Sequence, residues 1–331
     1  MNIIKRKNIF IAIGLGVMVV SLAIVMFNGL KLGIDFAGGA LTEVAYDVVP
    51  EKVMIESELN ELELGGYSLR ESTDEAGRPG FLLRTRDLSE DERVIISTVL
   101  TEDYEGAIIT RFTSIGPVIG QELRDKAVWA IGAVALIIIL YVAFAFAGVG
   151  KPVSSWVYGL ITILALVHDV LVPTAVMALL GVFAGVEIDV LFVMALLAVL
   201  GYSVNDTIVV FDRVRENLVK YRQEKKVKVK NELGQPEEQI EYIFTKPFAD
   251  IVGQSVDQTI LRSINTSVTT LLALGALYWL GGDVTETFAL ILMAGVLAGT
   301  YSSIFLANPL LVWYGERKAK QLVEAEVTRQ L

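Results

Sequence analysis

A chain of 331 residues that is 53% hydrophobic and only 20% charged is too apolar for an ordinary soluble domain, and its mean hydropathy of +0.56 predicts a membrane protein. It contains no cysteine and a single histidine, which excludes disulfides, thiolate metal sites and a histidine metal cluster. The net charge of −10 is unevenly distributed, with acidic residues concentrated between positions 31 and 125. We therefore expect no metal, no other cofactor and no enzymatic activity.

Six apolar stretches are long enough to cross about 30 Å of hydrocarbon as helices. The first follows three basic residues, as a signal peptide does, but no small-residue cleavage site ends it, so we interpret it as a retained anchor. An even number of crossings places both termini on one side. In chain order the stretches span residues 8–28, 127–148, 154–180, 189–211, 261–280 and 285–313.

Basic residues predict the orientation of these helices. They occur at the N-terminus, at Lys151, between Arg213 and Lys230 and in the C-terminal tail, whereas the loops 181–188 and 281–286 contain none. Because cytoplasmic loops are enriched in Lys and Arg, we expect both termini in the cytoplasm and the chain in the cytoplasmic (inner) membrane. The chain then divides into an anchor helix (1–30), an extracytoplasmic domain (31–125), a five-helix membrane domain (126–314) with a cytoplasmic loop (213–258), and a cytoplasmic tail (315–331).

The extracytoplasmic segment has the periodicity of short strands and helices. One helix is marked by Pro50 just before it, and another by Ser89 and Glu92, which have the spacing of a capping box. The order β-α-β-β-α-β predicts a small ferredoxin-like α+β domain between the first two membrane helices. The predicted elements are a strand at 40–49, a helix at 51–62, strands at 67–71 and 81–86, a helix from 89, and a strand at 107–113.

The cytoplasmic loop is charged throughout, and two interpretations are open. Residues 226–230 and 239–244 alternate in polarity around a Gly-Gln-Pro turn, which allows a short hairpin. A solvated loop whose basic half lies against anionic lipid is the favoured interpretation.

Ionisable residues within membrane helices are costly and usually mark a pathway or a proton relay. Asp206 lies in the fourth apolar stretch and Arg262 at the start of the fifth. Counting about 1.5 Å per residue from the outer helix ends gives both a similar depth, which allows them to pair. The alternatives are a carboxylate that only joins helices and an arginine that extends to the headgroups. Neighbouring residues that could act as relay or packing groups are Asn205, Thr207, Thr266 and Ser267.

The third apolar stretch contains His168 and Asp169. Because adjacent residues on a helix point about 100° apart, we expect no dyad between them, but relay or interhelical hydrogen bonding by each. Asp169 and Asp206 together would suit an intramembrane aspartyl protease. Helix counting separates the two carboxylates by about 10 to 15 Å, however, which argues against that activity.

Six short motifs occur in order along the chain: LGIDFAGG (32–39), IGPVIGQEL (115–123), HD (168–169), GYSVNDT with FDRVREN (201–217), QTILR with TS (258–267) and GTYSSIF (299–305). Together they resemble the motifs of the SecF family of protein-export membrane proteins. The sequence departs from the family pattern at Ala37, at Asp257 and Ser263, and in a longer loop at 222–245.

The resemblance implies one six-helix half of a transporter of the RND superfamily. A SecD-like subunit would supply the other half, YajC would often be nearby, and the exported polypeptide would leave the SecYEG channel with help from the proton gradient. It also implies that Asp206 and Arg262 belong to the proton path, a further Asp of which lies in SecD. No ATP-binding P-loop motif occurs in the sequence. Two alternatives stay open: an RND-type exporter of lipid or small molecules, and a non-transporting scaffold of the translocon.

Overall fold

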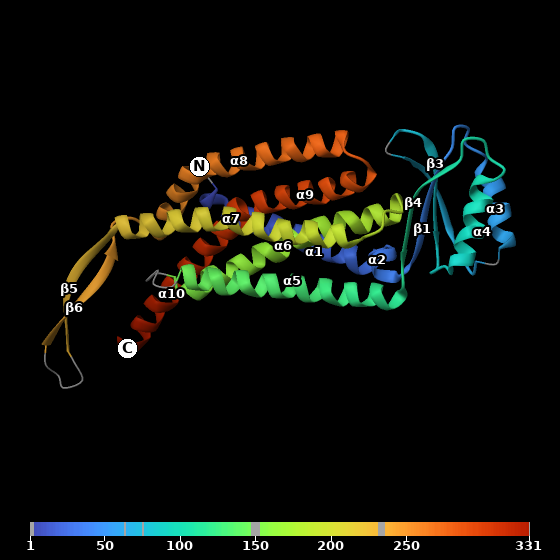
Figure 1. Cartoon of the computed structure of the whole chain (residues 1–331). Coiled ribbons are helices and arrows are strands. Elements are labelled where there is room, and N and C mark those ends of the chain that lie inside the picture. The colour runs from blue at the N-terminus through green and yellow to red at the C-terminus, as the bar shows by residue number, and fades with distance from the viewer. Residues whose placement is uncertain (1–2, 63, 75, 147–152, 231–235, 331) are drawn as a thin grey trace.

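The computed structural model describes residues 3–62, 64–74, 76–146, 153–230 and 236–330. Long helices form a bundle in the middle, a small sheet domain lies at one end, and a two-stranded hairpin extends from the other (Figure 1). Both termini lie toward the hairpin end (Figure 1). Lys151 and the turn residues 233–235, on which two of the sequence expectations depend, lie outside the described residues.

Six helices are long and apolar enough to cross a membrane, which confirms the predicted number. Four of them extend well beyond the apolar stretches: α5 begins at Pro117 rather than at 127, α7 continues beyond residue 211 to Lys220, α8 begins at Phe248 rather than at 261, and the last span continues through α10 to Gln330. The charged segments at the ends of these helices are helical too, although they lie beyond the apolar stretches. The spans are α1 (Lys7–Asn28), α5 (Pro117–Ala145), α6 (Ser155–Phe183), α7 (Val190–Lys220), α8 (Phe248–Leu280), and α9 (Asp283–Tyr301), which runs through the π-helical turn η2 (Ser302–Ala307) into α10 (Asn308–Gln330).

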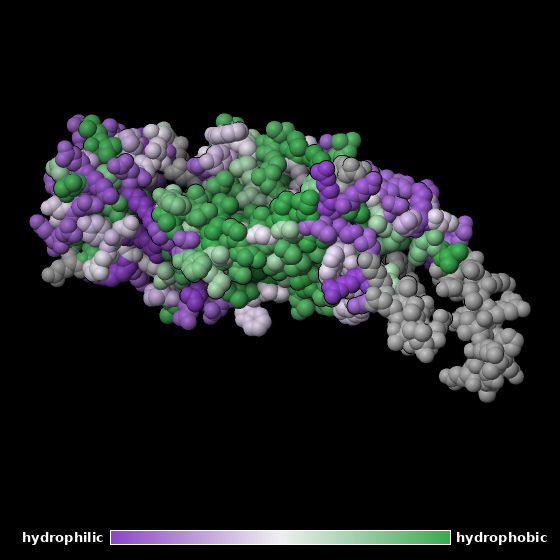
Figure 2. Space-filling model, turned by 180° about the vertical axis from the view of Figure 1, so that it is seen from behind, coloured by the Kyte–Doolittle hydropathy of each residue, from purple (hydrophilic) through white to green (hydrophobic). Residues whose placement is uncertain are grey.

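The helices α6, α7 and α9–α10 form the centre of the bundle, whereas α1, α5 and α8 expose most of their apolar surface. Figure 2 shows this surface as a hydrophobic zone between two hydrophilic ends. Glycines bring α9 close to α7: a Cβ at Gly295 would stand 2.1 Å from Val199, and one at Gly299 would stand 3.1 Å from Ser203. Gly132 of α5, in contrast, has no neighbour within 4 Å of its Cβ position among the described residues.

The sheet domain has the predicted β-α-β-β-α-β order. Its four strands are antiparallel in the order β2-β3-β1-β4, and α3 and α4 cover one face (Figure 1). Ser89 and Glu92 form the predicted capping box, and the Arg86 guanidinium beside Glu92 lowers the pKa of that carboxyl to about 2. The elements are β1 (Gly39–Ala45), α3 (Lys52–Glu61), β2 (Ser68–Thr73), β3 (Pro79–Thr85), α4 (Glu90–Thr101) and β4 (Ile108–Ile115).

The favoured interpretation of the cytoplasmic loop as unstructured is wrong. Strands β5 (Arg222–Lys230) and β6 (Pro236–Phe244) pair along their whole length as an antiparallel hairpin. The backbone of Thr245 donates to the carbonyl of Tyr221 at the base of this hairpin, 2.9 Å away. Alternating polarity therefore outweighs the charge of the segment, because each strand satisfies the backbone groups of the other.

Candidate functional site

Asp206 lies on the inner face of α7 and is half-buried among α8 and η2. Two hydroxyls donate to its carboxylate: Ser263 of α8 to Oδ1 and Ser303 of η2 to Oδ2. The carboxylate is thus held by neutral donors from two other helices. Such a group can bind or release a proton inside the bundle without losing its partners, because a hydroxyl both donates and accepts.

The structure does not form the expected pair between Asp206 and Arg262. Ser263 occupies the position that faces Asp206, and adjacent helical residues point about 100° apart, so Arg262 is turned to the exposed side of α8. Among the residues that the structure describes, none is recorded in a hydrogen bond or ion pair with the Arg262 side chain. Equal depth on two helices was therefore not sufficient to predict contact, since rotation about the helix axis decides which residue meets the neighbour.

His168 and Asp169 do contact each other, which corrects the expectation that neighbours on a helix form no dyad. Nδ1 of His168 lies 2.8 Å from Oδ1 of Asp169. Oδ2 of Asp169 accepts from Ser203 of α7 and from Ser302 of η2, the latter at 2.7 Å. Asp169 is fully buried and His168 is 2% exposed. Side chains of this length bridge a 100° separation when both rotamers turn toward one side of the helix.

The π turn η2 brings the two carboxylates into one network. Its consecutive residues Ser302 and Ser303 donate to Asp169 and Asp206 respectively. Asn308 donates to the Ser303 carbonyl at 2.6 Å, which satisfies a backbone acceptor in the widened turn. In the sequence, Ser302 and Ser303 belong to the GTYSSIF motif, which by itself gives them no role. A Ser-Ser pair in an apolar helix was the available signal, but it does not indicate which helices the hydroxyls face.

The remaining predicted polar residues have different environments. Asn205 is exposed, and Thr266 donates to the carbonyl of Arg262 on its own helix, 2.9 Å away. Ser267 joins α8 to α9 through a 2.6 Å hydrogen bond with Thr300. Thr207 is buried, and its hydroxyl has no partner among the described residues. Ser267 thus packs helices together, while Thr207 is an unsatisfied polar group one residue from Asp206.

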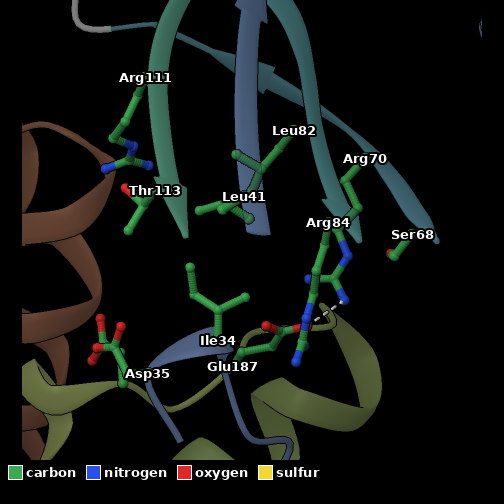
Figure 3. A pocket seen from close by; sticks show the side chains of 12 residues that line it. Ile34, Asp35, Leu41, Ser68, Arg70, Leu82, Arg84, Arg111, Thr113 and Glu187 are labelled. Carbon is green, nitrogen blue, oxygen red and sulfur yellow. Dashed lines mark hydrogen bonds and ion pairs between the residues drawn. The ribbon is translucent and has the colours of Figure 1, made fainter. Parts of the chain in front are cut away.

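A second polar region lies where the sheet domain meets the outer end of the bundle. A cavity of about 300 Å³ separates the open face of the sheet from α2 (Ile34–Ala37) and from the loop between α6 and α7. Arg84 of β3 forms an ion pair with Glu187 of that loop at 2.6 Å (Figure 3). Arg70 of β2 donates to the Gly185 carbonyl of the same loop.

Backbone hydrogen bonds extend this junction to the start of α7. The amide of Gly33 donates to the Ile188 carbonyl and the amide of Ile188 donates to the Lys31 carbonyl, both at 2.8 Å. Asp35 accepts from the first amide of α7, Val190, at 2.9 Å, which places a carboxylate at the positive end of that helix. The LGIDF segment therefore connects the sheet domain to the helix that carries Asp206.

The chemistry of these sites depends on the partners that surround their carboxylates. Within the described ranges, no group of three or more His, Cys, Asp or Glu side chains is arranged to hold a metal ion. The two membrane carboxylates have only hydroxyl and imidazole partners among the described residues. Hydroxyls and imidazole change protonation or hydrogen-bond direction readily, which suits a site that gains and loses protons.

Comparison with known proteins identifies the family. The model for "Protein export membrane protein SecD/SecF, C-terminal" matches residues 95–233 and 235–317, and that for the "SecD/SecF GG Motif" matches residues 23–48. The SecF subunit of the protein translocase from Thermobaculum terrenum is 36% identical over 322 residues, which cover 94% of this chain and 93% of that protein. The chain belongs to the SecF family. Six apolar helices together with SecF relatives make it a multi-pass inner-membrane protein.

Other SecF and SecDF proteins agree with this assignment. The SecF subunit from Pseudomonas aeruginosa is 34% identical, and the alignment covers 94% of this chain and 90% of that one. The SecDF protein of Thermus thermophilus is also 34% identical, but this chain covers only 37% of it. The crystal structure of a Thermus SecDF superposes with a TM-score of 0.75 at 30% identity, covering 96% of this chain and 39% of that chain. The SecF chain thus corresponds to about two fifths of a SecDF protein.

Proposed function

We propose that this chain is the SecF subunit of a SecDF-type complex that uses the proton gradient to assist the export of polypeptides. Its relatives are named as protein translocase subunits, and SecDF proteins carry a SecF-like portion within a longer chain. The observation that carries the proposal is Asp206, a carboxylate in the second half of a membrane-spanning helix and held there by two serine hydroxyls. An ionisable group at such a position usually serves transport.

Asp206 is the proton carrier of this chain in the proposal. Desolvation inside the bundle favours its neutral form, whereas donors and nearby cations favour the carboxylate. A helix movement that changes this balance loads or releases a proton. Each proton that crosses the membrane makes about 2.3 kcal/mol available per 100 mV, enough to bias two conformations that differ by a few kcal/mol.

Arg262 acts at the contact with the SecD subunit. Its guanidinium lies on the exposed side of α8 beside Leu261 and Ile264, which are 68% and 42% exposed. A charged side chain that faces hydrocarbon is unfavourable, so a protein surface with a complementary carboxylate is the expected neighbour. The SecD subunit supplies that surface and the second Asp of the path, and Arg262 biases the protonation of Asp206 from this interface.

The complex lies beside the SecYEG channel in the inner membrane, often together with YajC, and acts on the polypeptide that leaves the channel. The basic residues of the N-terminus and of Arg213–Arg222 support a cytoplasmic location of both termini. The sheet domain is then extracytoplasmic and moves with the bundle. A role in transport needs no bound cofactor, because the proton gradient is the energy source.

Replacement of Asp206 tests this function. Asp206→Asn retains shape and hydrogen bonding but cannot titrate, so it is expected to abolish proton-stimulated export in cells and in liposomes while expression and association with SecD are unchanged. Asp212→Asn is the matched control, since Asp212 lies at the cytoplasmic end of α7 in an exposed ion pair with Arg215. Normal proton-dependent export by Asp206→Asn would contradict the proposal.

The same assay separates the other functions that the sequence allows. A non-transporting scaffold would support export equally well with Asp206→Asn, and it would conduct no protons. An RND-type exporter of lipid or small molecules would conduct protons in response to its own cargo. Proton flux in liposomes that contain the complex and SecYEG, measured with and without a translocating polypeptide, distinguishes the three.

A further inference from the structure

The proposed function uses Asp206, yet a carboxyl group and an imidazole, those of Asp169 and His168, are buried more deeply in the bundle. Asp169 is 0% exposed and His168 is 2% exposed, whereas Asp206 is only half-buried. The two lie 2.8 Å apart at the centre of α6, which packs against α1, α5, α7 and α9. Ionisable groups in such a position are unfavourable unless they compensate each other's charge.

Three side chains contact the Asp169 carboxyl group: Nδ1 of His168 lies beside Oδ1, and the hydroxyls of Ser203 and Ser302 donate to Oδ2. Hydrogen bonds to the charged form of a carboxyl favour that form. A buried negative charge needs a cation nearby, and among the described residues His168 is the one basic group in contact with it.

His168 has the geometry to become that cation. When Nδ1 donates to an ionised Asp169, the neutral ring has its free lone pair on Nε2, which has no hydrogen-bond partner among the described residues. The ring stacks on Tyr301 with centroids 5.9 Å apart, and an aromatic face within about 6 Å attracts a cation. A proton on Nε2 would convert a negatively charged pair into a neutral one, which the low-dielectric interior favours.

Few other charges act on this pair. Asp206 on α7 is connected to it through the adjacent residues Ser302 and Ser303, and Tyr301 at the end of α9 stacks on the His168 ring and donates its hydroxyl to the Phe10 carbonyl of α1 at 2.9 Å. Helix α1 contains no ionisable residue after Lys7. In α5 the charged residues are confined to positions 122–126 near its outer end, and Tyr141 is its other titratable group.

We propose that His168 and Asp169 form a second proton-binding site of this chain, linked to Asp206 by the Ser302–Ser303 pair of η2. Nε2 of His168 binds the proton, and Asp169 supplies the counter-charge. Because Ser302 and Ser303 are adjacent, a change at either carboxylate acts on the same turn. This inference rests on the proposed role of Asp206 as a proton carrier.

The chain offers an unusually direct test, because His168 is its only histidine. Nitrogen-15 labelling of histidine in the full chain, purified without a histidine tag and placed in lipid nanodiscs, gives one pair of ring signals that need no assignment. A pH titration around the ordinary histidine pKa of about 6.5 reports which nitrogen carries a proton. We expect Nδ1 to stay protonated throughout and Nε2 to gain a proton as the pH falls.

Three variants test the assignment of partners. Asp169→Asn removes the counter-charge and is expected to lower the midpoint pH of the Nε2 transition by about 1 to 3 pH units. Asp206→Asn should also lower it, but by less than Asp169→Asn does, because Asp206 is connected to the pair only through Ser302 and Ser303. Asp212→Asn should leave it unchanged. If Asp169→Asn does not fold, the titrations of the wild type and of Asp206→Asn still test whether His168 binds a proton and whether it is linked to Asp206.

Two results would overturn the proposal. A ring that keeps one neutral form over the whole titration would exclude a second proton-binding site, and a midpoint that Asp206→Asn does not move would exclude the link. Neither result depends on export. Normal export by Asp206→Asn would instead contradict the proposed function, so the two failures are distinguishable.

Discussion

At the scale of residues, serine hydroxyls are the common feature of the two membrane carboxylates. Each carboxylate accepts from two of them, one of η2 and one of a neighbouring helix. A lysine or arginine in these positions would hold the carboxylate permanently ionised, whereas a hydroxyl can donate to the carboxylate or accept from the carboxylic acid. The choice of serine therefore permits both protonation states in the same geometry.

The position of Arg262 leads to a prediction about association with SecD. Arg262→Ala is expected to weaken that association by about 2 kcal/mol or more, because it leaves a buried partner group unpaired. Arg262→Lys keeps the charge but loses the planar fork, so it should cause a smaller loss. Co-purification at graded detergent concentration measures the effect, with Asp206→Asn as the control that retains association. Equal association of wild type and Arg262→Ala would place Arg262 away from the SecD contact.

At the scale of elements, close approach of α9 to α7 positions η2 between the two carboxylates. Gly295 and Gly299 stand against Val199 and Ser203, and larger residues there would move η2 away from Asp169 and Asp206. The same contact places Ser203 where it donates to Asp169. The packing of α9 against α7 therefore also determines which hydroxyls reach the two carboxylates.

Substitution of Gly295 tests this packing. The added methyl of Gly295→Ala would lie 2.1 Å from a branched valine, and overpacking of this kind costs about 1 to 3 kcal/mol of unfolding free energy. Gly132→Ala is the control, because nothing among the described residues lies within 4 Å and a helical Gly→Ala change stabilises by up to about 1 kcal/mol. Chemical unfolding in detergent measures both, and equal stability of the two variants would contradict the packing argument.

At the scale of the whole molecule, α7 connects the two polar regions. Its first amide is capped by Asp35, beside the junction with the sheet domain, and its second half carries Asp206. The junction is held by Arg84, Arg70 and Glu187 across the cavity of Figure 3. A movement of α7 that accompanies proton binding would therefore be transmitted to the sheet domain.

Glu187 is the group whose loss should loosen this junction. Glu187→Gln is expected to speed amide hydrogen exchange in residues 185–190 by up to about fivefold, because partly exposed ion pairs contribute up to about 1 kcal/mol. The control Glu90→Gln removes an exposed ion pair with Arg93 on α4 and should leave that segment unchanged. Exchange that is equally fast in both variants would show that the junction does not depend on Glu187.

The sequence by itself determined what hydrophobicity and local chemistry can encode. Six apolar stretches of membrane length, the β-α-β-β-α-β order and the Ser89 capping box were all predicted, because each depends on residues close together in the chain. Asp206 was recognised for the same reason, since a carboxylate in an apolar stretch is visible without a structure. The family resemblance rested on short contiguous motifs, and the comparisons confirmed it.

Only the tertiary structure decided which side chains meet. Helix rotation turned Arg262 outward and Ser263 toward Asp206, and rotamer choice brought His168 onto Asp169. The π turn, which widens the helix by one residue per turn, placed consecutive serines on carboxylates of two different helices. Depth along a helix follows from counting residues, but contact also depends on rotation about each axis, and that angle is set by the packing of all the helices together.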